Sequence, residues 1–143
     1  MNESSPQRFL VQQGLLIFLA GLLMGAFTQA VANPRMMMAA HTGTLMMGTF
    51  VLALAPAWQY LSISEGLERL TMRLLIGGAW VVSGALVFAA VFETSRTTPL
   101  LGAGYAGAAW AEAAVDVAFV VSSLALLVAA VFLVRAAYSN ADD

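Results

Sequence analysis

The chain has 143 residues, of which 61% are hydrophobic and 10% are charged. A soluble domain carries about 25% charged residues, so this composition indicates an integral membrane protein. The net charge is −2 and no basic run occurs, which argues against nucleic acid as a partner. The chain contains no cysteine, which excludes disulfides, cysteine-ligated zinc, iron–sulfur clusters and a thiolate nucleophile.

Four apolar stretches are each long enough to cross a bilayer, which takes about 20 mostly apolar residues in a helix. We predict spans at residues 10–32, 36–58, 70–92 and 109–137. Pro34 and Pro99 stand in two of the breaks between them, where they cannot continue a preceding helix. The predicted fold is all-α: a single integral membrane domain over residues 1–143, folded as an antiparallel bundle of four transmembrane helices.

The first span allows two interpretations. Arg8 precedes it and Ala30-Val31-Ala32 fits the small-x-small pattern of a cleavage site, so a signal peptide is an alternative to a transmembrane helix. The stretch is longer than the usual apolar region of a signal peptide, which favours the helix. Gly21 and Gly25 form a G-x-x-x-G, a pattern of close helix contact within or between subunits. Because so small a chain has little interior, we expect a homo-oligomer.

The arginines predict the orientation. An even number of spans places both termini on one side of the membrane. Arg8, Arg69, Arg73 and Arg135 belong to that side, against two arginines on the other. The positive-inside rule then predicts cytoplasmic termini, and we expect the membrane to be a bacterial inner membrane.

Apart from Arg73 and Arg135 near span ends, three ionisable residues lie inside the predicted spans, where such groups are costly and suggest function. His41, the only histidine, is about six residues into the second span, and Asp116 is about six residues into the fourth. Both spans start from the same membrane face, so the two side chains are predicted at similar depth. Glu112 precedes Asp116 by one helical turn and shares its face. Tyr105 lies in the glycine-rich approach to the fourth span.

Each of these residues also has a structural interpretation. His41 could donate a hydrogen bond to a backbone carbonyl and do nothing else. Glu112 could cap the fourth helix, since acids suit helix N-termini. Asp116 is too deep for a cap and needs a partner, for which His41 is one candidate. Tyr105 could be an ordinary interfacial aromatic residue, and the many methionines could simply fill irregular apolar space.

A single histidine limits the possible metal chemistry. Zinc takes three or four protein ligands, whereas haem iron needs only one proximal histidine. The residues that share a helix face with His41 are apolar and partly small, which suits a flat macrocycle; they are Met37, Met38, Thr44, Leu45 and Gly48. With one axial ligand the iron keeps an open position and can act as a Lewis acid, beside which a carboxylate could handle a proton.

Two motifs then resemble a known family. Asn33-Pro34-Arg35-Met36 followed by His41, and Gly104-Tyr105-x-Gly107 followed by Glu112, are similar in order and spacing to motifs of the hydroxylaminobenzene mutases, which are related to the styrene oxide isomerases. The resemblance extends over essentially the whole chain.

The resemblance implies an intramolecular rearrangement of a small aromatic substrate without redox turnover. Mutases of this family convert hydroxylaminoarenes to aminophenols. The isomerases convert aryl epoxides to aldehydes with a ferric haem b as Lewis acid, and are trimers. By resemblance His41 is the haem ligand, and Glu112 and Tyr105 match motif positions.

The chain also departs from the family pattern. Met47 stands where the mutases have asparagine, and Gly43 stands where they often have glutamate. The third span lacks the Asn-Trp expected in mutases and the Asp and Tyr expected in epoxide isomerases. The haem-binding half therefore matches while the substrate-orienting half is substituted. Either Asp116 compensates, or the substrate differs, or the catalysis has been lost.

Three functional hypotheses remain open. The first is a membrane-embedded haem-dependent isomerase in which Asp116, Glu112 and Tyr105 orient the substrate or handle its proton. The second is a non-catalytic haem-binding or electron-transfer subunit with a methionine as second ligand. The third is a small transporter or packing subunit that uses Glu112 and Asp116, against which no inverted repeat is evident.

Overall fold

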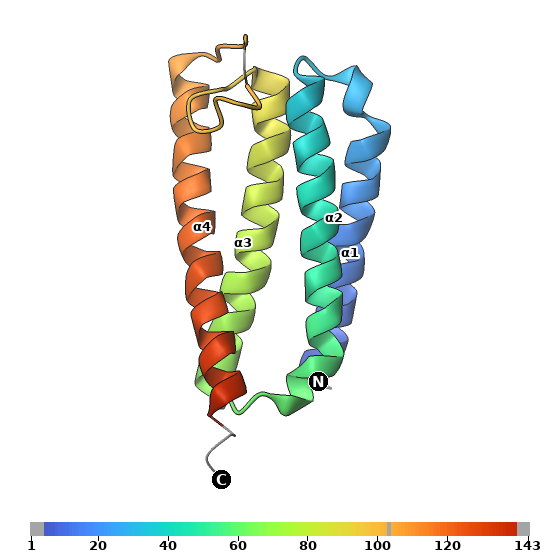
Figure 1. Ribbon diagram of the computed structural model, residues 1–143, viewed down its shortest axis with the longest axis vertical. Coiled ribbons are helices and arrows are strands. Elements are labelled where there is room, and N and C mark those ends of the chain that lie inside the picture. The colour runs from blue at the N-terminus through green and yellow to red at the C-terminus, as the bar shows by residue number, and fades with distance from the viewer. Residues whose placement is uncertain (1–4, 103, 140–143) are drawn as a thin grey trace.

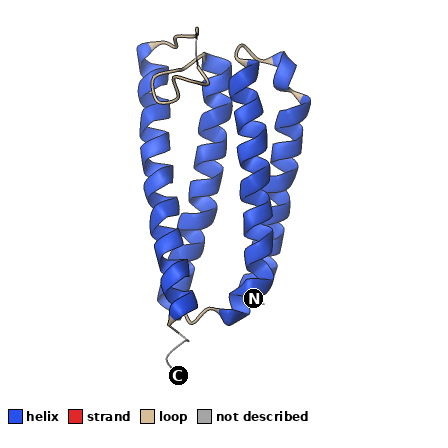
Figure 2. Cartoon of the chain, in the orientation of Figure 1, coloured by secondary structure: helices blue, strands red, loops and turns tan. Residues whose placement is uncertain are grey.

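Helices make up all the regular structure that the computed structural model describes, which covers residues 5–102 and 104–139. The four long helices are antiparallel (Figures 1 and 2): α1 Pro6–Ala26, α2 Pro34–Ala57, α3 Glu65–Phe92 and α4 Ala109–Tyr138. Short 3-10 turns at Thr28–Ala30 and Trp58–Tyr60 follow α1 and α2. All four helices are long and apolar enough to cross a membrane, which confirms the predicted all-helical membrane protein.

The first and third helices differ in their bounds from the predicted spans. Helix α1 begins at Pro6 because the Ser5 side chain accepts a hydrogen bond from the Arg8 N–H and proline suits the first helical position. It ends at Ala26 instead of residue 32, and Thr28 then donates its hydroxyl to the Gly25 carbonyl. Helix α3 starts at Glu65 instead of residue 70, because its polar first turns continue the helix beyond the apolar run.

The helices pack as two hairpins. The contacts of α1 with α2 and of α3 with α4 are the most extensive, and a smaller α2–α3 contact joins the hairpins. Glycine allows α1 and α2 to approach closely: a Cβ atom at Gly48 would lie 2.6 Å from the Phe18 backbone nitrogen. A buried cluster of methionine, alanine and valine then brings α2, α3 and α4 together; its residues are Met36, Met37, Ala40, Ala89, Ala90 and Val115.

The two ends of the molecule differ. Helix α1 begins and α4 ends at one end, which we call the terminal end (Figure 1). The α1–α2 and α3–α4 connections lie together at the other, the loop end. Asn33 joins these connections and is fully buried. Its Oδ1 accepts from the Met36 N–H at 3.1 Å and caps α2, while its Nδ2 donates to the Leu101 carbonyl at 3.2 Å and its backbone N–H donates to the Ala90 carbonyl at 2.9 Å.

Candidate functional site

The His41 ring is oriented by a backbone carbonyl of α1. Its Nδ1 lies 2.8 Å from the Gly21 oxygen. A carbonyl can only accept, so the neutral imidazole carries its proton on Nδ1 and its lone pair on Nε2. In the described part of the chain Nε2 has no hydrogen-bond partner, and the ring is only partly buried. The ring is therefore fixed in one tautomer with one nitrogen available to a ligand.

The G-x-x-x-G of α1 provides the seat for this ring. A Cβ atom at Gly25 would lie 2.6 Å from His41 Nδ1 and 2.7 Å from its Cε1, so the imidazole occupies the space that a side chain would fill. A Cβ atom at Gly21 would lie 2.9 Å from the Leu45 backbone nitrogen. The two glycines thus bring α1 and α2 together and also make room for the imidazole.

The residues predicted to line a cofactor beside His41 are largely engaged in helix contacts within the chain. Met37 and Thr44 are buried, and the Thr44 hydroxyl has no hydrogen-bond partner among the described residues. Leu45 packs on Gly21, and Gly48 packs on the α1 backbone. Met38 is the exception, with 47% of its surface exposed. Leu45 and Gly48 thus face α1 together with His41, whereas Met37 packs in the cluster that joins α2 to α3 and α4.

Asp116 lies at the expected depth but does not pair with His41. Each residue is seven positions after the start of its helix, at Ala109 for α4 and at Pro34 for α2, and both helices start at the loop end. The Asp116 carboxylate accepts hydrogen bonds from the Arg96 guanidinium, with Nε at 2.6 Å, and from the Thr97 hydroxyl. The interpretation of His41 as its partner is therefore wrong within one chain, because the imidazole is directed at α1.

Glu112 anchors the α3–α4 connection. Its carboxylate is buried, with 8% of the residue exposed, and accepts three backbone N–H bonds. Oε1 accepts from Ser95 at 2.9 Å and from Gly107 at 3.2 Å, and Oε2 accepts from Arg96 at 3.0 Å. These bonds satisfy N–H groups at both ends of the connection rather than the first turn of α4. Both carboxylate oxygens are thus engaged in holding this connection.

Tyr105 lies in the same connection, close to the start of α4. It is partly buried, and its backbone N–H donates to the Gly102 carbonyl at 2.9 Å. Its hydroxyl makes no hydrogen bond to the described residues, so it can bind another group. Trp110, by contrast, packs edge-on against Phe88 and Phe92, with ring centroids 5.9 and 5.3 Å away.

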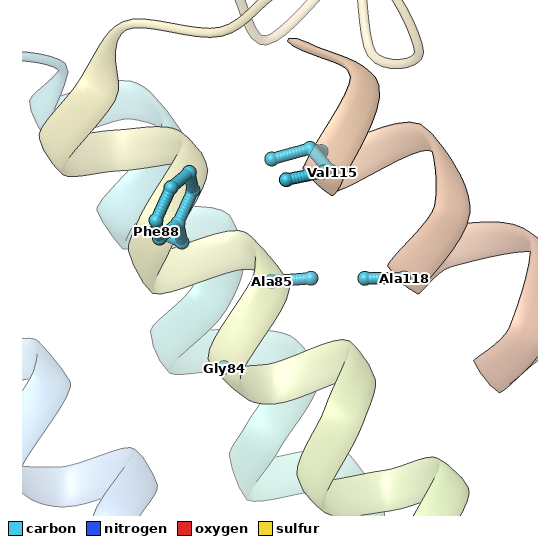
Figure 3. Close-up of a pocket in the computed structure, with 6 residues that line it drawn as sticks. Gly84, Ala85, Phe88, Val115 and Ala118 are labelled. Carbon is cyan, nitrogen blue, oxygen red and sulfur yellow. The ribbon is translucent and has the colours of Figure 1, made fainter. Parts of the chain in front are cut away.

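A small apolar pocket of about 230 Å³ opens between α3 and α4. Figure 3 shows Ala85 and Ala118 facing each other across it, with Phe88 and Val115 beside them. Its six lining residues carry no polar side chain, so the pocket cannot orient a substrate by hydrogen bonds. We assign it no catalytic role.

Sequence reasoning missed Arg96 and Thr97 as partners of Asp116, and the role of Gly25 as a seat for the imidazole. The sequence holds a weak signal for the first, since Arg96 is the one cation between α3 and α4. It holds no signal for the second, because a G-x-x-x-G predicts close contact but not which side chain fills the space.

Comparison with known proteins identifies the family. The sequence profile of the styrene oxide isomerase family matches residues 6–138. The chain belongs to this family. Two relatives from Ectopseudomonas oleovorans are named as hydroxylaminobenzene mutases. HabB is 31% identical over 128 residues, which cover 89% of this chain and 78% of HabB. HabA is 29% identical over 98 residues, which cover 68% of this chain and 73% of HabA.

These matches confirm the predicted family and make this member of the styrene oxide isomerase family an isomerase. No solved structure gives a significant match to the chain.

Proposed function

We propose that this family member is a membrane-embedded, haem-dependent isomerase of a small aromatic compound. This proposal rests on the orientation of the His41 imidazole, which donates from Nδ1 to the Gly21 carbonyl and leaves Nε2 as a ligand. Metal-ligating histidines usually donate their second ring N–H to a carbonyl or carboxylate, which fixes the tautomer and raises the basicity of the ligating nitrogen. The ring of His41 has this arrangement.

The available ligands suit haem b better than a bare ion. The described residues contain no group of three or more His, Cys, Asp and Glu side chains that could hold a metal ion. A porphyrin supplies its own four nitrogen ligands and needs only an axial ligand from the protein, which His41 can provide. Met38 is the member of the predicted lining set that is most accessible to such a group. When bound, a ferric haem supplies a Lewis acid for a lone pair of the substrate.

The residues of the loop end have separate roles in this proposal. Tyr105 offers a hydroxyl that can hydrogen-bond the substrate oxygen or nitrogen. Asp116 is a carboxylate whose Arg96 partner is exposed, so it can exchange that contact for a proton of the substrate. Glu112 acts as a positioning residue, because its three bonds hold the connection that carries Tyr105 and Arg96.

The names of the relatives suggest two substrate classes. One is an aryl epoxide, which rearranges to an aldehyde, and the other is a hydroxylaminoarene, which rearranges to an aminophenol. Both reactions are isomerisations: substrate and product contain the same atoms, so neither an oxidant nor a reductant is consumed. We further propose a homo-oligomer, trimeric by family resemblance, in a bacterial inner membrane with cytoplasmic termini.

Two measurements test this function. The absorption spectrum of detergent-purified protein, expressed with ample haem, should show a haem band that His41→Ala abolishes. A colourless wild-type preparation would contradict haem dependence. Product analysis with styrene oxide and with phenylhydroxylamine should then show turnover of at least one compound. If haem is bound and neither compound reacts, the non-catalytic haem-binding subunit becomes the better description.

A further inference from the structure

Another cavity lies at the terminal end, far along the helices from His41. It is a groove of about 740 Å³ between the starts of α1 and α3, within the range of about 300–1,000 Å³ typical of ligand sites. Ser5, which caps α1, forms one wall together with Pro6 and Phe9 of that helix. The other wall consists of two rows of α3 side chains at four-residue spacing: Glu65, Arg69, Arg73 and Gly77 in one row, and Glu68, Met72 and Ile76 in the other.

The charges of this groove fall within the head-group layer of a bilayer. Helix α3 has 28 residues and is therefore about 42 Å long, whereas a hydrocarbon core is about 30 Å thick. After Arg73, no charged residue occurs until Glu93, so residues 74–92 supply the apolar length that the core requires. Arg73 thus lies at the edge of the hydrocarbon, with Arg69 and then Glu65 one and two turns further toward water.

The two guanidinium groups of the groove are available for a ligand. Among residues 5–102 and 104–139, neither Arg69 nor Arg73 forms an ion pair or a side-chain hydrogen bond, and Glu65 has no partner either. Glu68 differs, because its Oε1 accepts from Trp58 Nε1 at 2.7 Å. One free carboxylate therefore lies outermost and two free cations lie below it.

The deeper part of the groove is apolar and has a defined end. Phe9, Met72 and Ile76 line it, and a Cβ atom at Gly77 would meet nothing within 4 Å, so this position is open. One turn further along the helices, Trp80 Nε1 donates to Gln13 Oε1 at 3.2 Å and bridges α3 to α1. The groove thus runs from water into the outer hydrocarbon, and this hydrogen bond joins the two helices one turn beyond its lining.

We propose that this groove binds a phospholipid with an ethanolamine head group. In such a lipid the ammonium lies on the water side of the phosphate and the acyl chains lie on the other side. The order of groups along α3 matches: the Glu65 carboxylate for the ammonium, Arg69 and Arg73 for the phosphate, and the open space at Gly77 for an acyl chain. Arginine binds phosphate oxygens through two parallel N–H groups. Neither Arg69 nor Arg73 forms an ion pair with another of the described residues, so both guanidinium groups can bind the phosphate.

Native mass spectrometry of the delipidated protein in detergent tests this site with three lipids of identical acyl chains. Phosphatidylethanolamine should bind about tenfold more tightly than phosphatidylglycerol, which offers Glu65 no ammonium, and than phosphatidylcholine, whose ammonium has no N–H donor. Equal binding of the three lipids by the wild-type protein would overturn the proposal. Glycerophosphoethanolamine should not compete at equal concentration, because it lacks acyl chains; full competition would overturn the lipid assignment.

Matched variants separate the two halves of the head group. The double variant Arg69→Gln/Arg73→Gln should bind phosphatidylethanolamine about tenfold more weakly. Arg135→Gln, at the same end but outside the groove, should bind it as the wild type does. Glu65→Gln should abolish the preference for ethanolamine over glycerol while keeping phosphate binding, and this exposed substitution does not threaten the fold.

Two results of the variant experiment would refute the site. One is a double variant that binds phosphatidylethanolamine like the Arg135→Gln control. The other is an oligomer that binds no lipid and dissociates when Arg69 and Arg73 are replaced, which would assign the groove to a second copy of the chain.

Discussion

Replacing Gly25 with alanine should displace the His41 imidazole without touching the histidine itself. The added Cβ atom would lie 2.6 Å from Nδ1, whereas ordinary contact begins near 3.4 Å, so the ring must retreat by about 0.8 Å. Because both the Gly21 carbonyl and the new methyl group belong to α1, retreat from α1 lengthens the 2.8 Å hydrogen bond to about 3.6 Å, beyond bonding distance.

The free-energy terms can be separated with a control. A Gly→Ala change inside a helix contributes about 1 kcal/mol of helix propensity wherever it is made. At Gly25 this gain opposes an overpacking cost of about 1–3 kcal/mol and the loss of a hydrogen bond. Gly84→Ala is the matched control, because it is also inside a helix and its Cβ atom would meet nothing within 4 Å.

The assay is haem titration of the apo protein in detergent, followed by absorbance. Loss of an orienting partner costs a metal site about 10–100-fold in affinity, and we expect a loss of this size for Gly25→Ala and none for Gly84→Ala. Gly25→Ala protein that binds haem as tightly as the control, with an unchanged spectrum, would refute the role assigned to the Gly21 carbonyl.

Three further predictions concern the loop end. Glu112→Gln should destabilise the protein by about 2 kcal/mol in thermal unfolding, because an amide cannot accept all the N–H bonds of a buried carboxylate, whereas Glu93→Gln should change little. Asn33→Ala should cost about 1 kcal/mol more than Asn33→Ser, which keeps a cap on α2; equal melting temperatures would contradict this. Asp116→Asn should reduce isomerase turnover while haem binding and melting temperature stay near wild type, because its ion pair with Arg96 is exposed; unchanged turnover would exclude a proton-handling role.

The apolar runs were sufficient to predict four helices, because a helix is the only way such a segment can satisfy its backbone in lipid without neighbours. The apolar runs could not predict the residues at which the helices begin and end, since these depend on local hydrogen bonds of polar groups. Helix α1 stops at Ala26 although Phe27 and residues 30–32 are apolar, because the chain leaves the helix for a 3-10 turn at Thr28. Helix α3 extends back to Glu65 although the sequence is polar there.

Counting residues along each span was enough to predict the depth of the ionisable side chains. It could not predict which neighbouring element each side chain faces. Position along a helix is fixed by the rise per residue, and the rotation about the axis is set by packing. The methionines illustrate this, since Met37 is buried in the helix contacts while the neighbouring Met38 is 47% exposed. The partners of Asp116 could be predicted only by knowing how the α3–α4 connection folds back, and no pattern in the sequence specifies this.

The assignment of chemistry to His41 follows from which polar groups at the loop end are already occupied. Glu112 uses both carboxylate oxygens on backbone N–H groups, and Asn33 uses its amide and its carbonyl to join the connections. Asp116 is shared between a guanidinium and a hydroxyl. Among the described residues, the buried hydroxyls of Thr44 and Thr94 have no hydrogen-bond partner, and neither have His41 Nε2 and the Tyr105 hydroxyl, whose side chains are only partly buried. The hydrogen bond made by one ring nitrogen holds the imidazole in place. The lone pair on the other nitrogen is not used by the fold, so it is available for a ligand that the chain does not itself supply.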